Sequence, residues 1–180
     1  MNAILKWGTS MTLVFLLLSC SGTTNASSPT TDRPVIASES TDEQTENPRW
    51  QVLPVGATVD VGETTIELEI ARTPRQQAMG LMFRDRMERD RGMLFPFSPP
   101  QPTNFWMKNT LIPLDMIFLR NGEVMYIAED VPPCPPLAAS CPSYGPDGTV
   151  LIDNVIELNA GRADELGLEV GDRLEIEYLE

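Results

Sequence analysis

The sequence contains no histidine among its 180 residues. Histidine is the usual base in serine and cysteine nucleophile pairs, and it is a frequent ligand of zinc and other transition metals. Its absence excludes Ser-His and Cys-His catalysis and every histidine-based metal site. We expect the protein to hold no metal and no other cofactor.

Basic residues are also scarce. The chain has 13 Lys and Arg against 26 Asp and Glu, which gives a formal net charge of −13 at pH 7. Nucleic-acid binding requires clustered basic side chains that neutralise phosphates, so the charge argues against a nucleic-acid partner. The same acidity argues against attachment to anionic lipid through charge alone.

A long apolar run is missing at the N-terminus, where the segment Met11 to Leu18 is too short to cross a bilayer as a permanent helix. With Lys6 before it, this segment is typical of a signal peptide. It continues into Leu-Leu-Ser-Cys at 17–20, which resembles the lipobox of bacterial lipoproteins. The resemblance implies that residues 1–19 are removed and that Cys20 is lipidated. An ordinary secretory signal or an uncleaved anchor is the alternative.

Each of these interpretations places the rest of the chain outside the cytoplasm, and the lipoprotein places it on the periplasmic side of a bacterial membrane. Residues 20–49 contain no aromatic residue and are rich in Ser, Thr, Asp, Glu and Pro. Such a segment buries too little apolar surface to offset its ordering entropy. We predict a disordered tether at 20–49 and one folded domain at 50–180.

Turn and strand patterns dominate this domain. Residues 57–71 predict a hairpin around Gly62-Glu63, because Ile66, Leu68 and Ile70 alternate with polar residues. Asn121-Gly122 predicts a second hairpin between strands at 114–119 and 123–128. Further strands are expected at 92–97, 105–108, 149–158 and 173–179, with Pro96 favouring an edge position or an early end for the first of them.

Two short helices complete the pattern. Thr73-Pro74-Arg75-Gln76 is a capping box that should begin one helix, and residues 162–166 predict another. Strands and helices do not alternate regularly, which argues for an α+β domain. The expected fold is a β-rich α+β domain built as a small, partly closed antiparallel or mixed β-barrel with two short helices.

The sequence contains three distinctive motifs: GLMFR at 80–84, RGMLFPF at 91–97 and FWMKNTLIPLDMIF at 105–118. Together with the hairpin that follows, they resemble the domain of unknown function 192 family, which comprises small bacterial and archaeal proteins that are often exported. The resemblance covers most of 59–179 and implies a compact, barrel-like β-rich fold. It implies no reaction. The chain departs from the family pattern by an insertion at 131–148.

The insertion contains Cys134 and Cys141 in a proline-rich loop. In an exported protein, two cysteines that close a short loop are most simply a structural disulfide. A redox pair would usually have C-x-x-C spacing, and a metal site would need further soft ligands. The disulfide is therefore the interpretation that the spacing favours.

The polar residues of the motifs are the candidate ligand-binding residues, and they are Arg84, Trp106, Lys108, Asn109, Thr110 and Asp115. A cation, an amide, a hydroxyl and a carboxylate beside a tryptophan suit a small polar ligand. The structural alternative pairs Lys108 with Asp115, lets the Asn and Thr side chains stabilise a turn, and buries the tryptophan.

Two further kinds of function stay open. An envelope hydrolase could use Lys108 and Asp115, with Thr110 or Ser143 as a hydroxyl partner. An interaction with another envelope protein could use an exposed group of methionines at 79, 82, 87 and 93, although methionines at such spacing are usually core. The interpretation favoured by the sequence is a monomeric, lipid-anchored, non-catalytic module that binds a small polar ligand or an envelope protein.

Overall fold

The computed structural model describes residues 49–180. The predicted signal peptide, the lipidation site Cys20 and the tether up to residue 48 lie outside the described residues. Within residues 49–180, no helix has the length and apolar character needed to span a membrane.

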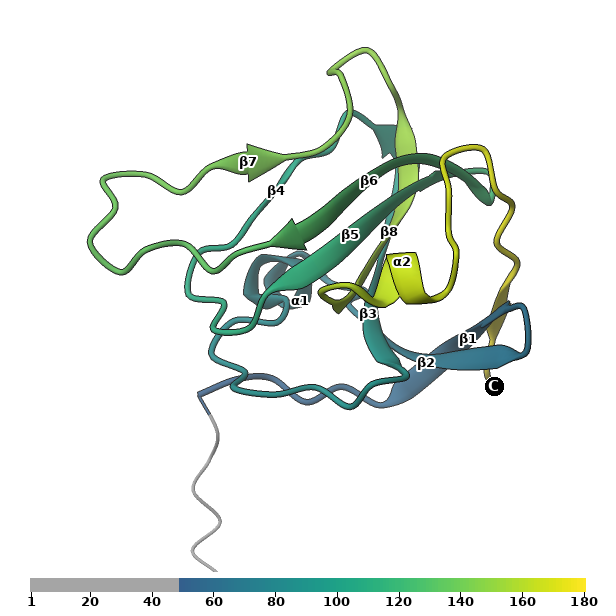
Figure 1. Ribbon diagram of the computed structural model, residues 1–180, viewed down its shortest axis with the longest axis horizontal. Helices are drawn as coiled ribbons and strands as arrows, with labels where there is room; N and C mark the ends of the chain where they lie inside the picture. Colours follow the sequence, from purple (N-terminus) through teal and green to yellow (C-terminus); the bar gives the residue numbers. More distant parts are fainter. Residues whose placement is uncertain (1–48) are drawn as a thin grey trace, which may run out of the picture. The chain divides into compact units, whose positions relative to one another are not determined.

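A seven-stranded mixed sheet forms the domain, with the strand order β6-β5-β8-β3-β2-β1-β9 (Figure 1). All neighbouring strands are antiparallel except β2 and β3, which are parallel. The strands of this sheet are β1 Val55–Val61, β2 Thr64–Ile70, β3 Arg91–Gln101, β5 Leu114–Arg120, β6 Glu123–Val131, β8 Ile152–Asn159 and β9 Ile176–Tyr178. A two-stranded sheet pairs β4 Phe105–Trp106 with β7 Ser143–Tyr144, and the helices are α1 Pro74–Met79 and α2 Arg162–Glu165. The β-rich α+β fold with two short helices is therefore confirmed.

Both predicted hairpins are present, and their turns have the expected backbone. Gly62 has φ +61° between β1 and β2, while Glu63 does not have a positive φ. Asn121 and Gly122 both have positive φ values, 51° and 79°, as a type I′ turn between β5 and β6 requires. The capping box is also formed, because the Thr73 hydroxyl accepts from the Gln76 amide and the Gln76 side chain accepts from the Thr73 amide.

Pro96 does not end its strand or place it at an edge. β3 lies between β2 and β8 and continues to Gln101. The pairing with β2 stops at Leu94, whereas Pro96 faces Asn154 of β8. Pro96 therefore lies beyond the segment that hydrogen-bonds to β2, so its missing N–H leaves the ladder on that side intact.

The expected barrel closure is not supported, because β6 and β9 remain the two edges of an open sheet. The segment that leads into β9 approaches β6 through a single bridge between Glu123 and Arg173, supported by hydrogen bonds such as Val124 N–H to the Asp172 carbonyl. These contacts stop before β9 begins. The correct description is a large open mixed sheet whose edges approach each other at one corner.

The side chains of the central strands alternate between two buried faces. One face packs around Leu94, Ile117 and Ile156, and the other packs around Phe95, Phe118 and Val155. Strands buried on both faces carry apolar residues at nearly every position, and β5 is buried from Leu114 to Leu119. The second face carries the site described below.

Asp115 is the polar exception in β5, and its side chain is fully buried. Its Oδ1 accepts from the backbone N–H groups of Asp130 and Gly161 at 2.8 and 3.1 Å, and its Oδ2 accepts from Ala163 N–H at 2.8 Å. The α2 N-cap residue, Gly161, supplies no side-chain cap of its own. Asp115 therefore caps α2 from a neighbouring strand and ties α2 to β5 and β6.

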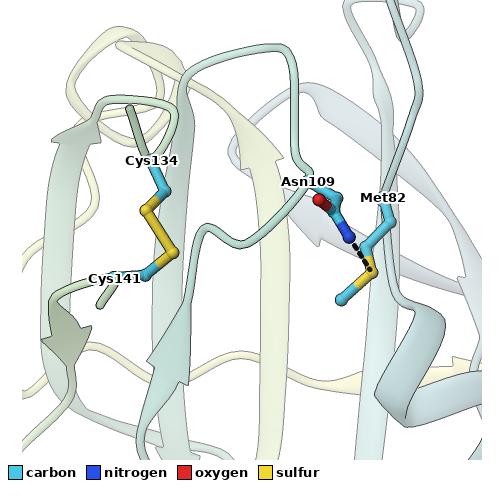
Figure 2. The surroundings of a disulfide bond; sticks show 4 residues. All are labelled: Met82, Asn109, Cys134 and Cys141. Carbon is cyan, nitrogen blue, oxygen red and sulfur yellow. Dashed lines mark hydrogen bonds between the residues drawn. A yellow bond between two sulfur atoms is a disulfide. The ribbon is translucent and has the colours of Figure 1, made fainter. Parts of the chain in front are cut away.

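The disulfide between Cys134 and Cys141 is formed, with the Cα atoms 5.5 Å apart (Figure 2). It closes part of the loop that joins β6 to β7, which projects at the left of Figure 1. The bond therefore restrains the insertion whose strand β7 pairs with β4.

Replacing Asp115 with alanine should lower the free energy of unfolding by at least about 3 kcal/mol, because three backbone N–H groups would lose their buried acceptor. Urea unfolding followed by circular dichroism measures this change. The control is Asp85→Ala, which removes an exposed carboxylate and should stay within about 0.5 kcal/mol of wild type. Similar losses in the two variants would contradict the capping role.

Mass spectrometry of protein alkylated before and after reduction should detect the thiols of Cys134 and Cys141 only after reduction. A Cys134→Ala, Cys141→Ala double variant should be destabilised by about 2 to 3 kcal/mol, because the unfolded loop gains conformational freedom. Two alkylated thiols in the unreduced protein would contradict the bond.

Candidate functional site

A pocket of about 290 Å³ lies against the second face of the sheet. Its walls come from α1 and the turn after it, from β3, and from the loop that leads into β4. Glu157 of β8 contributes a buried polar group from the sheet. Two wider hollows of about 640 and 460 Å³ occur elsewhere on the described domain.

Hydrogen bonds between two sequence motifs hold one wall of the pocket. The Phe83 N–H donates to the Asn109 carbonyl at 2.8 Å, and the Asn109 side-chain amide contacts the Met82 sulfur at 3.8 Å (Figure 2). Asn109 has φ +58°, a left-handed conformation that asparagine tolerates better than most residues. The GLMFR and FWMKNT motifs therefore meet and build a single structure.

Aromatic rings form the opposite part of the pocket. Phe105 packs edge to face against Phe95, Phe97 and Phe118, with ring centroids 4.9, 6.4 and 5.9 Å apart. Edge-to-face packing on three sides fixes the orientation of the ring. Since Phe95, Phe97 and Phe105 all line the pocket, this wall is rigid and apolar.

Glu157 lies within this apolar surrounding and is only 5% exposed. Its partners across the sheet are Met93 of β3 and Met116 of β5, which are both fully buried. Within residues 49–180, no hydrogen-bond partner contacts the Glu157 Oε2 atom, which is itself buried. A buried carboxyl oxygen without a partner is costly, and it is rare in folded proteins.

A second buried glutamate in the same row of the sheet shows the contrast. Glu69 of β2 pairs with Met93, which in turn pairs with Glu157. The Arg84 guanidinium binds both Glu69 oxygens, at 2.8 and 2.6 Å, and the Leu53 N–H also donates to Glu69. Arg84 also donates to the Gln51 carbonyl, while its buried Nε–H has no partner within residues 49–180. Arg84 therefore neutralises Glu69 and is committed to it.

Burial raises the pKa of Glu157 from its ordinary value of 4.5 to about 8, while the positive charge of Arg84 acts in the opposite direction. The desolvation effect prevails because the Arg84 guanidinium is bound to Glu69 and makes no hydrogen bond to Glu157. At neutral pH the Glu157 carboxyl is therefore mostly uncharged. In that form it can donate one hydrogen bond and accept others.

Trp106 and Lys108 stand at the opening of the pocket. Trp106 is 53% exposed, Lys108 is also exposed, and both line the pocket. The Lys108 ammonium lies 5.2 Å from the centroid of the Trp106 ring, within the range of a cation–π contact. The predicted pleat is present here, because Phe105 and Met107 turn inward while Trp106 and Lys108 turn outward.

The predicted ligand-binding residues are thus only partly brought together. Trp106, Lys108 and Thr110 line the pocket, and Asn109 holds its wall. Arg84 and Glu69 line the separate hollow of about 460 Å³, and Asp115 caps α2. Among the methionines, those at 79 and 82 line the pocket, that at 93 is fully buried, and that at 87 packs against the core.

Sequence reasoning did not select Glu157, which is the most unusual group in the pocket. Its sequence context is Val-Ile-Glu-Leu at 155–158, where apolar residues surround one acid. Alternation along the strand places Glu157 on the same face as Val155, whereas Ile156 and Leu158 lie on the opposite face. A single glutamate within a short, otherwise apolar segment was the available signal.

Replacing Glu157 with glutamine should stabilise the protein increasingly as the pH rises from 5 to 8. The raised pKa means that the folded wild type holds a proton that the unfolded chain releases above about pH 4.5, so wild-type stability falls with pH. The difference in free energy of unfolding between the variants should grow by about 1.4 kcal/mol per pH unit. Urea titrations at several pH values measure it, and a constant difference would contradict the shift.

The domain resembles known structures over most of its length. A crystal structure from Sinorhizobium meliloti, described as that of a candidate transcription regulator, is 34% identical, with a TM-score of 0.58 over 69% of this chain and 96% of its own. A protein of unknown function from Novosphingobium aromaticivorans is 36% identical, with a TM-score of 0.56 over 67% of this chain and 83% of its own. No curated protein is significantly similar in sequence.

The sequence motifs, the sheet and these neighbours agree with a family match that covers residues 57–176, from the first hairpin to the start of β9. The matching family is described as "Uncharacterized ACR". The match includes every element that forms the pocket wall, the Asp115 cap and the buried Glu157. The protein belongs to the domain of unknown function 192 family.

Proposed function

We propose that the protein is a non-catalytic binding module that takes a small ligand in the pocket above Glu157. The observation that carries this proposal is the buried Glu157 Oε2, which has no partner within residues 49–180 although it belongs to a group that lines the pocket. A ligand that reaches this oxygen would supply the missing hydrogen bond. Burial of a polar group is tolerated where a bound molecule satisfies it.

The size and lining of the pocket support the same conclusion. About 290 Å³ is room for a molecule of a few to about a dozen non-hydrogen atoms, at the lower end of typical ligand sites. Aromatic rings and methionines provide apolar contact, while Thr110, Lys108 and Glu157 provide a few polar groups. Small-molecule sites commonly combine these features.

The location of the module follows from the N-terminal sequence. We propose that lipidation of Cys20 anchors the protein to a bacterial membrane, with residues 20–49 as the tether and the domain on the periplasmic side. The domain would act as a monomer, and an envelope protein could be a second partner. The net charge of −13 argues against transferring a role in transcription from the Sinorhizobium meliloti neighbour, because DNA binding needs a basic surface.

A second candidate function is acid–base catalysis, which the pKa of Glu157 favours. A carboxyl group with a pKa near 8 is suited to proton transfer at neutral pH. The sequence-based alternative, an envelope hydrolase using Lys108 and Asp115, loses support because both Asp115 oxygens bind backbone N–H groups away from the pocket. An enzyme in this pocket would have to use Glu157.

Ala78→Phe should abolish small-molecule binding, because Ala78 lines the pocket, is itself exposed, and can accept a larger side chain that fills the pocket without disturbing the core. Ligand-observed NMR of the domain with a library of small amines, alcohols, acids and sugars should find compounds that bind the wild type and not this variant. The control is Ala139→Phe, which makes the same change at an exposed loop residue and should retain binding.

The same spectra distinguish binding from catalysis. A compound that binds and remains chemically unchanged over hours of incubation supports the module, whereas a new product that requires Glu157 supports the enzyme. Binding that persists in Ala78→Phe, or an absence of binding across the whole library, would contradict the pocket as the site.

A further inference from the structure

We propose that the ligand of this pocket carries an organic ammonium group, which forms an ion pair with Glu157, and an apolar body that packs against the aromatic wall. This inference rests on the proposed function, since it names the chemical class of molecule that the pocket takes. It depends on three features of the described domain: the unpartnered Oε2 atom of Glu157, the aromatic lining of the pocket and the arrangement of the neighbouring charges.

The first feature is that no hydrogen-bond partner from residues 49–180 contacts the buried Glu157 Oε2 atom. Its neighbours in the sheet are Met93 and Met116, whose thioether side chains have no N–H or O–H group. The Gln77 side-chain amide, which also lines the pocket, donates to the Pro96 carbonyl at 2.8 Å. An ammonium ion carries up to three N–H donors, so it can supply the hydrogen bond that the Glu157 Oε2 atom does not receive within residues 49–180.

The second feature is the aromatic lining. Phe95, Phe97, Phe105 and Trp106 line the same pocket as Glu157. Cations are attracted to the faces of aromatic rings, and the Lys108 ammonium already lies over Trp106. A carboxyl group beside an aromatic wall is suited to a molecule with an apolar body and a single positive charge.

The third feature is the arrangement of the neighbouring charges. Arg84 is the cation whose field reaches Glu157, and it is bound by both oxygens of Glu69. Lys108 lines the opening, where its exposed charge is screened by water. The sheet neighbours β3 and β5 present methionines to Glu157, so they add no charge beside it. The net charge of −13 also raises the local concentration of cations around the protein.

The ionisation of Glu157 does not prevent this pairing. With a pKa of about 8, the carboxyl group loses its proton at pH 7 at a cost of about 1.4 kcal/mol. A charge-assisted hydrogen bond inside an apolar pocket is worth more than a neutral one, and it exceeds this cost. A neutral alcohol would gain only the weaker bond, so the pocket should discriminate in favour of the amine.

Isothermal titration calorimetry with benzylamine, benzyl alcohol and benzoate tests the inference, because the three probes share one ring and differ in charge. At pH 7 the wild-type protein should bind benzylamine at least about tenfold more tightly than benzyl alcohol, and benzoate most weakly. Glu157→Gln keeps the shape of the side chain and should abolish the preference for the amine. Glu129→Gln makes the same change at an exposed carboxylate and should keep it.

Proton linkage gives a readout that a purely structural role of Glu157 would not produce. Benzylamine binding at pH 7 should release close to one proton from Glu157, seen as a dependence of the measured heat on the buffer, and Glu157→Gln should release none. The affinity for benzylamine should rise by about tenfold per pH unit up to about pH 8 and then level off.

The possible outcomes separate the ammonium class from the binding function. Benzyl alcohol could bind as tightly as benzylamine, with the binding of both abolished in Ala78→Phe. This result would support the pocket as a binding site and overturn the proposal that its ligand carries an ammonium group. Benzylamine binding without proton release would also overturn the ammonium class. If none of the three probes binds and the compound library also gives no ligand, both the ammonium class and the binding function are overturned.

Discussion

The carboxylate of Asp115 accepts three backbone hydrogen bonds from two other parts of the chain, and much of the domain depends on this group. It joins strand β5 to Asp130 in β6 and to the first turn of α2. Because α2 is only four residues long and has no side-chain cap of its own, it needs an acceptor supplied by the tertiary structure. Ala163 of α2 then packs in the core on the first face of the sheet. A buried polar residue near the start of β5 therefore organises the packing around it.

The FWMKNTLIPLDMIF motif at 105–118 has a different role at each of its two ends. Its beginning, from Phe105 to Thr110, forms the wall and opening of the pocket, and its end, at Asp115, holds the fold together. The turn at Asn109 connects the two ends and also receives a hydrogen bond from Phe83. Residues that look like one polar cluster in the sequence are therefore separated in space.

Two glutamates in one row of the sheet show how a protein can treat buried charge in opposite ways. Glu69 is neutralised by the bidentate contact with Arg84, whereas Glu157 has no such partner within the described domain and responds by a raised pKa. In the first arrangement, the two buried charges compensate each other. The second costs stability as the pH rises, and such costs are often retained where a group serves binding or catalysis.

The sequence by itself determined the local structure of this protein, because local structure depends on residues that are close in the chain. The Asn121-Gly122 turn, the capping box at Thr73 and the pairing of Cys134 with Cys141 were all predicted and are present. Only the tertiary structure decided that the sheet stays open, that Asp115 caps α2 and that the Glu157 Oε2 atom lies in the pocket without a partner from residues 49–180. These facts depend on strand order and register, which bring β2, β3, β5 and β8 side by side, and no short-range pattern specifies which residues meet across a sheet.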